Sequence, residues 1–293
     1  MAETSAHVST TVDLGPYAVH RVGFGAMQLP GRGVMGPPRD HDTAVAVLRR
    51  AVELGVDHID TAQYYGPDVA NELIREALHP YPENLALVSK VGAVRDAQGG
   101  WPPAQQPAEL RAGVEDNLRT LGVERLAAVN LRLTDPVPGY TPPPFEDQLA
   151  EMVRMRDEGL IGGVGVSNVT LEQLDVAIRL AGVVCVQNPY SLLDRSHEDL
   201  LQRCQQEGIA FVPFFPLGSA FPGMPKVTEN PVVTGLAERR GVTAAQVGLA
   251  WLLHHADNIL LIPGTSSVAH LEENMAAGTL TLSAAELAEL EAV

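Results

Sequence analysis

The chain has 293 residues, and its 20 Lys and Arg against 36 Asp and Glu give a formal net charge of −16. Apolar residues make up 45% of it and charged residues 19%, a balance that suits a large folded core and excludes broad disorder. The acidity argues against a nucleic-acid or anionic-membrane partner, because phosphate binding needs a basic surface.

Short apolar runs rich in β-forming residues alternate along the chain with stretches of helical periodicity. The predicted strands are 22–27, 56–60, 85–90, 126–133, 160–167, 183–188, 209–216 and 258–264. The predicted helices are 43–54, 69–78, 107–121, 145–158, 171–180, 198–207, 230–240 with 244–255, and 268–277. Strands that alternate with helices pair in parallel through right-handed crossovers, so this pattern predicts an α/β fold, a (β/α)8 TIM barrel.

Both ends of the chain add elements to the predicted barrel. The turn LGPY at 14–17, between TVD and AVHR, predicts an N-terminal β-hairpin that closes the barrel bottom. Thr170 with Gln173, and Ser283 with Glu286, have the spacing of a capping box, so a further helix is expected after Ser283. No linker divides the chain, which predicts a single domain over 1–293.

The alternative fold is an open doubly wound sheet. That fold binds dinucleotides with a G-x-G-x-x-G turn after its first strand. The only local candidate has Gly23 and Gly25 but continues with Met27 and Gln28, and no helix begins there. This weak motif favours the barrel.

Cysteine usage and the chain's N-terminal sequence bear on the compartment. The chain has two cysteines, Cys185 and Cys204, which are too few for disulfide bonds to stabilise a protein of this size. The sequence has no CxxC spacing that would suggest a metal site. We expect Cys185 to be an inert core thiol. With no signal peptide at the N-terminus and no apolar run of about 20 residues, we expect a cytoplasmic protein without a membrane contact.

Polar residues at the carboxyl ends of the predicted strands are the first candidates for catalysis in a barrel. Asp60 ends the second strand, Tyr65 follows it, and Lys90 ends the third. Arg132 lies on the fourth strand, on the same face as Asn130. An ammonium beside a phenol lowers its pKa, and a carboxylate holds the ammonium, so Asp60, Lys90 and Tyr65 form a candidate general-acid relay. It would protonate an oxygen that receives a hydride, and the hydride requires a cofactor.

Each of these residues also has a structural interpretation. Asp60 and Lys90 could be a buried ion pair, and Tyr65 a loop aromatic. Arg132 could simply hold a nearby carboxylate, and Asn168 and Asn188 could be helix caps or turn residues. Asp60, Tyr65 and Lys90 all fall at or just after the carboxyl ends of two successive predicted strands, which favours the catalytic interpretation.

The last predicted strand leads into a candidate phosphate site. Gly264, Thr265, Ser266 and Ser267 precede a helix that begins near Val268, so hydroxyls and backbone N–H groups meet at a positive helix end. The alternative interpretation is that Ser267 only caps the following helix.

Taken together, these motifs resemble the aldo-keto reductase family. The resemblance runs from GFGAMQL at 23–29 through IDTAQYYG, Lys90, GVSN at 165–168, VQNPY at 186–190 and FFPLG at 214–218 to IPGTSSVAHLEEN at 262–274. It implies that Tyr65 donates a proton, with Asp60 and Lys90 in support, and that the chain binds NADPH. The implied cofactor contacts are Gly25, Ala26, Met27, Asp60, Ser167, Asn168, Gln187, Phe214, Phe215, Pro216, Leu217, Gly218, Ser219, Ile262, Gly264, Thr265, Ser266, Ser267, His270, Glu273 and Asn274.

The resemblance also divides these contacts by role. Ser167, Asn168 and Gln187 match the residues that bind the nicotinamide carboxamide, and Leu217 with Ser219 those near the pyrophosphate. Thr265, Ser267 and His270 fall on the 2′-phosphate region, and Glu273 with Asn274 on the adenine contacts.

Three positions depart from the family pattern. His270 stands where the family usually has another basic residue in the 2′-phosphate pocket, so NADPH binding is implied by the resemblance alone. Phe214 stands where a Tyr usually stacks on the nicotinamide, and it keeps the aromatic face while losing the hydroxyl. Arg132 stands where a His is common. Because a guanidinium stays protonated, Arg132 can polarise a carbonyl but cannot shuttle a proton, and the acid role falls more firmly on Tyr65.

The full pattern is most similar to a bacterial branch of the family that reduces pyridoxal to pyridoxine with NADPH, and Arg132 fits that branch. The expected substrate is therefore pyridoxal or a similar aromatic aldehyde. The alternatives are a cofactor-sensing regulatory barrel resembling a potassium-channel β-subunit, and a barrel lyase or isomerase that binds no NADPH. The sequence leaves the oligomeric state and the reaction direction open.

Overall fold

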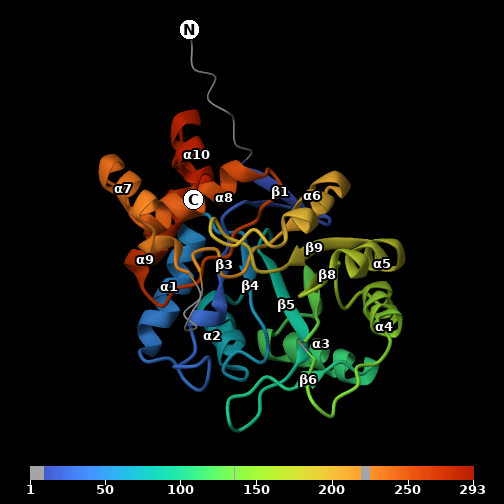
Figure 1. The fold of residues 1–293 in the computed structure, drawn as a ribbon. Coiled ribbons are helices and arrows are strands. Elements are labelled where there is room, and N and C mark those ends of the chain that lie inside the picture. Colours follow the sequence, from blue (N-terminus) through green and yellow to red (C-terminus); the bar gives the residue numbers. More distant parts are fainter. Residues whose placement is uncertain (1–9, 135, 219–224) are drawn as a thin grey trace.

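The computed structural model describes residues 10–134, 136–218 and 225–293. Parallel strands lie at its centre with helices around them (Figure 1). The hydrogen-bonded order is β10-β9-β8-β7-β5-β4-β3, and every neighbouring pair along this path is parallel. The strands are β3 (Phe24–Gly25), β4 (His58–Asp60), β5 (Ala86–Ala93), β7 (Ala128–Arg132), β8 (Val164–Ser167), β9 (Val183–Gln187) and β10 (Ala210–Phe211).

The segment after α8 closes this sheet into a barrel. Ile259 bridges Phe211 beside β10, and Leu261 bridges Val22 beside β3, both in parallel. The predicted strand 258–264 is thus present as two isolated bridges, and the predicted strand 209–216 is shortened to β10. Pro213 and Pro263 have no N–H to donate, which limits both ladders. The predicted barrel is confirmed and the doubly wound alternative is wrong.

The helices follow the predicted positions closely. They are α1 (His41–Glu53), α2 (Val69–Leu78), α3 (Pro107–Leu121), α4 (Phe145–Asp157), α5 (Leu171–Ala181), α6 (Glu198–Glu207), α7 (Pro231–Arg240), α8 (Ala244–His255), α9 (Val268–Ala276) and α10 (Ala284–Glu291). Short 3-10 turns occupy Ala26–Gln28, Val227–Glu229 and Ala277–Thr279. None of the helices in the described part of the chain is long and apolar enough to cross a membrane.

The N-terminal hairpin is present as predicted, with β1 (Thr11–Leu14) antiparallel to β2 (Tyr17–His20). Leu14 and Val19 are buried in one cluster with Ala86, Ala128 and Ala210 from the barrel strands. The hairpin therefore fills the barrel bottom, and the site must form at the opposite, carboxyl end of the strands.

One strand was not predicted. β6 (Pro103–Ala104) pairs in antiparallel fashion with the end of β5, at Gly92 and Ala93. Its Pro-rich surroundings are typical of a loop, so no local pattern indicates a strand there. β6 brings Trp101 and Gln105 to the carboxyl end of the barrel strands.

Candidate active site

The ends of β4 and β5 hold a buried ion pair. The Lys90 ammonium bonds to Asp60 Oδ1 and donates to the Thr61 carbonyl at 3.0 Å. Gln187 Nε2, from the end of β9, donates to Asp60 Oδ2 at 2.6 Å. Both charged side chains are less than 10% exposed, at 8% for Lys90 and 3% for Asp60. The carboxylate therefore fixes the amine from one side, as the sequence predicted, and Gln187 orients the carboxylate.

Tyr65 lies in the loop after β4 and packs against this pair. Its backbone N–H donates to the Ala62 carbonyl at 2.9 Å, which turns the chain back over the strand end. The Lys90 Nζ atom lies 5.0 Å from the centre of the Tyr65 ring. The ammonium thus stabilises the ring through a cation–π contact. Within the described part of the chain, no hydrogen bond joins the Tyr65 hydroxyl to Lys90.

The electrostatics of Tyr65 differ from the expectation. Burial raises the pKa of Tyr65 well above its usual value, the Asp60 charge raises it further, and Arg132 lowers it. Lys90 was expected to lower this pKa, and that expectation is wrong, because burial and the Asp60 charge both act in the opposite direction. The phenol is therefore held in its protonated form, which is the state a proton donor needs.

Arg132 ends β7, and its charge acts on the Tyr65 hydroxyl. Its backbone carbonyl accepts from Gln105 Nε2 at 3.2 Å, and a Cβ at Gly92 would come within 2.3 Å of that oxygen. This close approach needs a glycine, because any side chain at 92 would displace the end of β7. Arg132 is half-buried, so its guanidinium can reach a bound carbonyl or anion.

Cys185 is inert, as expected. It is 1% exposed in the barrel interior, and its thiol donates to Asn130 Oδ1 at 3.3 Å. Burial raises the pKa of the Cys185 thiol well above its usual value, so the reactive thiolate does not form at neutral pH.

The ends of β8 and β9 carry the residues expected at the nicotinamide. Asn168 has a left-handed φ of 58°, and its Nδ2 donates to the Leu133 carbonyl at 3.2 Å. Asn188 bonds with both side-chain atoms to the backbone of Val169, at 3.2 and 2.9 Å. The turn interpretation is therefore correct for Asn188, whereas Ser167 and Gln187 remain at the barrel mouth.

Phe214 and Phe215 lie beside these strand ends. Phe214 N–H donates to the Asn188 carbonyl at 3.2 Å, and Tyr190 N–H donates to the Phe214 carbonyl at 3.3 Å. The two phenylalanine rings are perpendicular, with centres 5.1 Å apart. Leu217 and Gly218 follow in the same loop, while the predicted contact Ser219 lies outside the described residues.

The segment from Ile262 to α9 fits a phosphate group. Ser267 caps α9 by accepting from His270 N–H at 3.4 Å, and Thr265 Oγ1 accepts from Ser267 N–H at 3.1 Å. The first turn of α9 thus presents N–H groups and a positive dipole end next to hydroxyls, a donor set that suits an anion. A Cβ at Gly264 would come within 2.5 Å of the Gly25 carbonyl, so the two backbone segments touch there.

An aromatic cluster at the site was not predicted from the sequence. Tyr64 is perpendicular to Tyr65 and to Trp101, with ring centres 5.5 and 5.4 Å away. Arg95 stacks on Trp101, with its guanidinium carbon 3.9 Å from the ring centre. The doubled tyrosine and the rarity of Trp in the chain were the available signals, but no spacing rule connects residues 64, 95 and 101.

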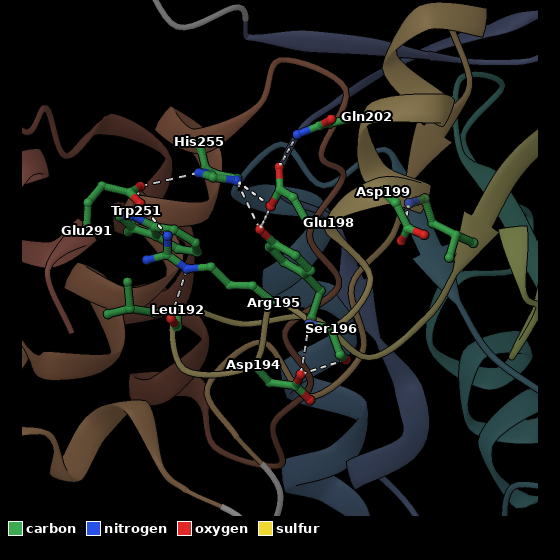
Figure 2. A network of polar contacts seen from close by, with 12 residues as sticks. Leu192, Asp194, Arg195, Ser196, Glu198, Asp199, Gln202, Trp251, His255 and Glu291 are labelled. Carbon is green, nitrogen blue, oxygen red and sulfur yellow. Dashed lines mark hydrogen bonds and ion pairs between the residues drawn. The ribbon is translucent and has the colours of Figure 1, made fainter.

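A second network of polar contacts joins the segment after β9 to α8 and α10 (Figure 2). The Tyr190 hydroxyl bonds to Glu198 and lies 2.9 Å from His255 Nε2. His255 Nδ1 lies 3.3 Å from Glu291 Oε1, which also accepts from Trp251 Nε1 at 2.9 Å. Since Tyr190 pairs with Phe214 through its backbone, this network connects α10 to the predicted nicotinamide-binding residue.

Comparison with known proteins then identifies the family. The model of the aldo/keto reductase family matches residues 21–293. The chain belongs to the aldo/keto reductase family. It is 47% identical to pyridoxine 4-dehydrogenase of Escherichia coli K12 over 290 residues, which cover 97% of this chain and 98% of the relative. An uncharacterized oxidoreductase of Schizosaccharomyces pombe is 38% identical, with 96% and 89% covered.

Solved structures agree with this assignment. An aldo-keto reductase of Klebsiella pneumoniae in complex with NADPH superimposes with a TM-score of 0.81 at 29% identity, covering 98% of this chain and 95% of that one. The resemblance inferred from the sequence motifs is confirmed. As an aldo/keto reductase the chain is an oxidoreductase that acts on CH–OH groups, and the lyase or isomerase alternative is wrong.

Proposed function

We propose that this aldo/keto reductase reduces pyridoxal to pyridoxine, or a similar aromatic aldehyde to its alcohol, with NADPH. The observation that carries the proposal is the buried Tyr65, whose ring packs against the Lys90 ammonium that Asp60 holds. The extensive identity with E. coli pyridoxine 4-dehydrogenase supports the substrate class.

The proposed chemistry separates a hydride from a proton. NADPH, when bound, would supply the hydride that reduces the carbonyl carbon. Tyr65 donates the proton to the carbonyl oxygen, and Arg132 polarises that oxygen. The phenolate left behind gains stabilisation from the Lys90 ammonium, which lies over the ring and is held by Asp60.

The proposed cofactor site extends from the nicotinamide end to the adenosine end. Ser167, Asn168 and Gln187 would hold the carboxamide, and Phe214 would pack on the ring. The α9 N-terminus with Thr265 and Ser267 would bind phosphate. The remaining proposed contacts are Gly25, Ala26, Met27, Phe215, Pro216, Leu217, Gly218, Ser219, Ile262, Gly264, Ser266, His270, Glu273 and Asn274.

The test is Tyr65→Phe, assayed with NADPH and pyridoxal by the loss of reduced-cofactor absorbance. Removal of a general acid should lower kcat by about 10²- to 10⁴-fold. NADPH affinity, measured by fluorescence titration, should stay unchanged, because Phe keeps the ring over Lys90.

Tyr81→Phe serves as the matched control. The Tyr81 hydroxyl donates to the Leu121 carbonyl at 2.7 Å, away from the site, so its turnover should equal that of the unmodified protein. Unchanged turnover in Tyr65→Phe would remove this residue from the acid role. NADPH binding without turnover of any aldehyde would instead favour a cofactor-sensing barrel.

A further inference from the structure

The Tyr64 hydroxyl is a buried donor that the proposed chemistry does not use. Tyr64 is 3% exposed, and in the described part of the chain its hydroxyl has no hydrogen-bond partner. Buried hydroxyl groups nearly always bond to protein or water, because an unmade hydrogen bond costs free energy. The Tyr64 ring contacts the proton donor Tyr65. Its unpaired hydroxyl therefore points to a bound group that accepts a hydrogen bond from it.

The Tyr64 ring is held in place from two sides. Tyr65 and Trp101 both pack perpendicular to it. Trp101 is fixed in turn by Arg95, which stacks on it and donates to the Gly33 carbonyl at 2.8 Å. The hydroxyl cannot swing away to find another acceptor, so it is a preorganised donor.

The surroundings of Tyr64 favour a negatively charged acceptor. Burial raises the pKa of Tyr64 well above its usual value, so the hydroxyl keeps its proton and can donate a hydrogen bond. The charges of Lys90 and Arg132 lower the pKa of this hydroxyl, whereas Tyr65 and Asp60 raise it. Because Asp60 is already paired with Lys90, the two cations would stabilise an anionic oxygen near Tyr64.

We propose that Tyr64 determines substrate specificity by donating a hydrogen bond to an ionised oxygen substituent next to the reacting carbonyl. The substrate class is then the aromatic aldehydes with a hydroxyl ortho to the aldehyde, a pattern that pyridoxal contains. Tyr65 binds the carbonyl oxygen and the neighbouring Tyr64 binds the substituent. This inference rests on the proposed aldehyde reduction.

The test compares two aldehydes that differ only in the ortho hydroxyl. We would measure kcat/KM with NADPH for 2-hydroxybenzaldehyde and for benzaldehyde, in the unmodified protein and in Tyr64→Phe. The variant should lose at least about tenfold for 2-hydroxybenzaldehyde, because the site then lacks a partner for the buried oxygen. Benzaldehyde should change less than about twofold, since Phe keeps the ring packing.

Tyr81→Phe is the control, and it should leave the ratio of the two kcat/KM values unchanged. An equal loss for both aldehydes in Tyr64→Phe would show that the residue only positions Tyr65 and Trp101, and would overturn the inference. No loss for either would overturn it as well.

A binding measurement separates this inference from the proposed function. 2-Hydroxybenzaldehyde is titrated into the protein saturated with NADP⁺, and its phenolate absorbance reports the Kd. Weaker binding by about tenfold in Tyr64→Phe supports the inference even if no aldehyde is reduced, an outcome that would reject the proposed reduction alone. Equal Kd values would reject the role of Tyr64 whether or not the protein reduces aldehydes.

Discussion

His58 lies two residues before Asp60 on β4, so strand alternation places both side chains on the same face. Its ring is 1% exposed, and its Nδ1 has no hydrogen-bond partner in the described residues. Burial lowers the pKa of His58 to about 4, and Lys90 contributes, while Asp60 and Asp57 oppose the shift. The imidazole is therefore neutral at physiological pH and becomes charged only in acid.

This histidine should make the protein labile in acid. Between the unfolded pKa of about 6.5 and the folded pKa of about 4, the unfolded chain binds more protons, so stability falls as the pH falls. The linkage predicts a loss of about 2 kcal/mol in unfolding free energy between pH 7 and pH 5. Urea unfolding of the unmodified protein and His58→Asn at both pH values measures it. An equal pH dependence in the two proteins would assign the acid lability to other groups.

At the scale of single elements, capping residues define where several helices begin. Thr170 accepts from Gln173 N–H at 3.2 Å, and Gln173 Oε1 accepts from Thr170 N–H at 2.9 Å. Ser283 and Glu286 form the same box at the start of α10. Gly182, with φ at 64°, ends α5 in the left-handed conformation. The two capping boxes were correctly predicted from the sequence.

Removal of one cap should have a modest and local effect. Thr170→Ala should lower the unfolding free energy by about 1 kcal/mol, because the Gln173 N–H loses its acceptor. Thr234→Ala on α7 is the control, since Thr234 does not cap its helix, and it should change stability by less than about 0.5 kcal/mol. The urea midpoints of the two variants, compared at a constant m-value, measure this difference in stability. Equal midpoints for the two variants would contradict the capping role.

In the molecule as a whole, Glu291 joins the C-terminal helix to several residues outside that helix. Glu291 on α10 accepts from Trp251, lies beside His255 and pairs with Arg195 from the loop before α6 (Figure 2). The Arg195 guanidinium also lies 4.7 Å from the Trp251 ring centre. Through His255 and Tyr190 these contacts reach the backbone of Phe214.

Glu291→Ala should weaken this attachment. Glu291 is 41% exposed, so we discount its ion pair and expect a loss of about 1–2 kcal/mol in unfolding free energy, mainly from the Trp251 and Arg195 contacts. Trp251 fluorescence during urea unfolding is the measurement. Glu289→Ala removes only an exposed pair with Arg239 and should cost less than about 0.5 kcal/mol. A Glu291→Ala protein as stable as Glu289→Ala would show that α10 is held by apolar packing alone.

The alternation of strands and helices could be predicted from residue patterns, as could the N-terminal hairpin, the capping boxes and the Asp60–Lys90 pair. These features depend on residue period, on capping chemistry and on strand order, all of which can be seen in the chain. The tertiary structure alone decided that Lys90 lies over the Tyr65 ring, that β6 pairs with β5, and that Arg95 and Trp101 enclose Tyr64. Such contacts join side chains from separate loops, and their geometry depends on how the packed barrel places those loops rather than on any local pattern.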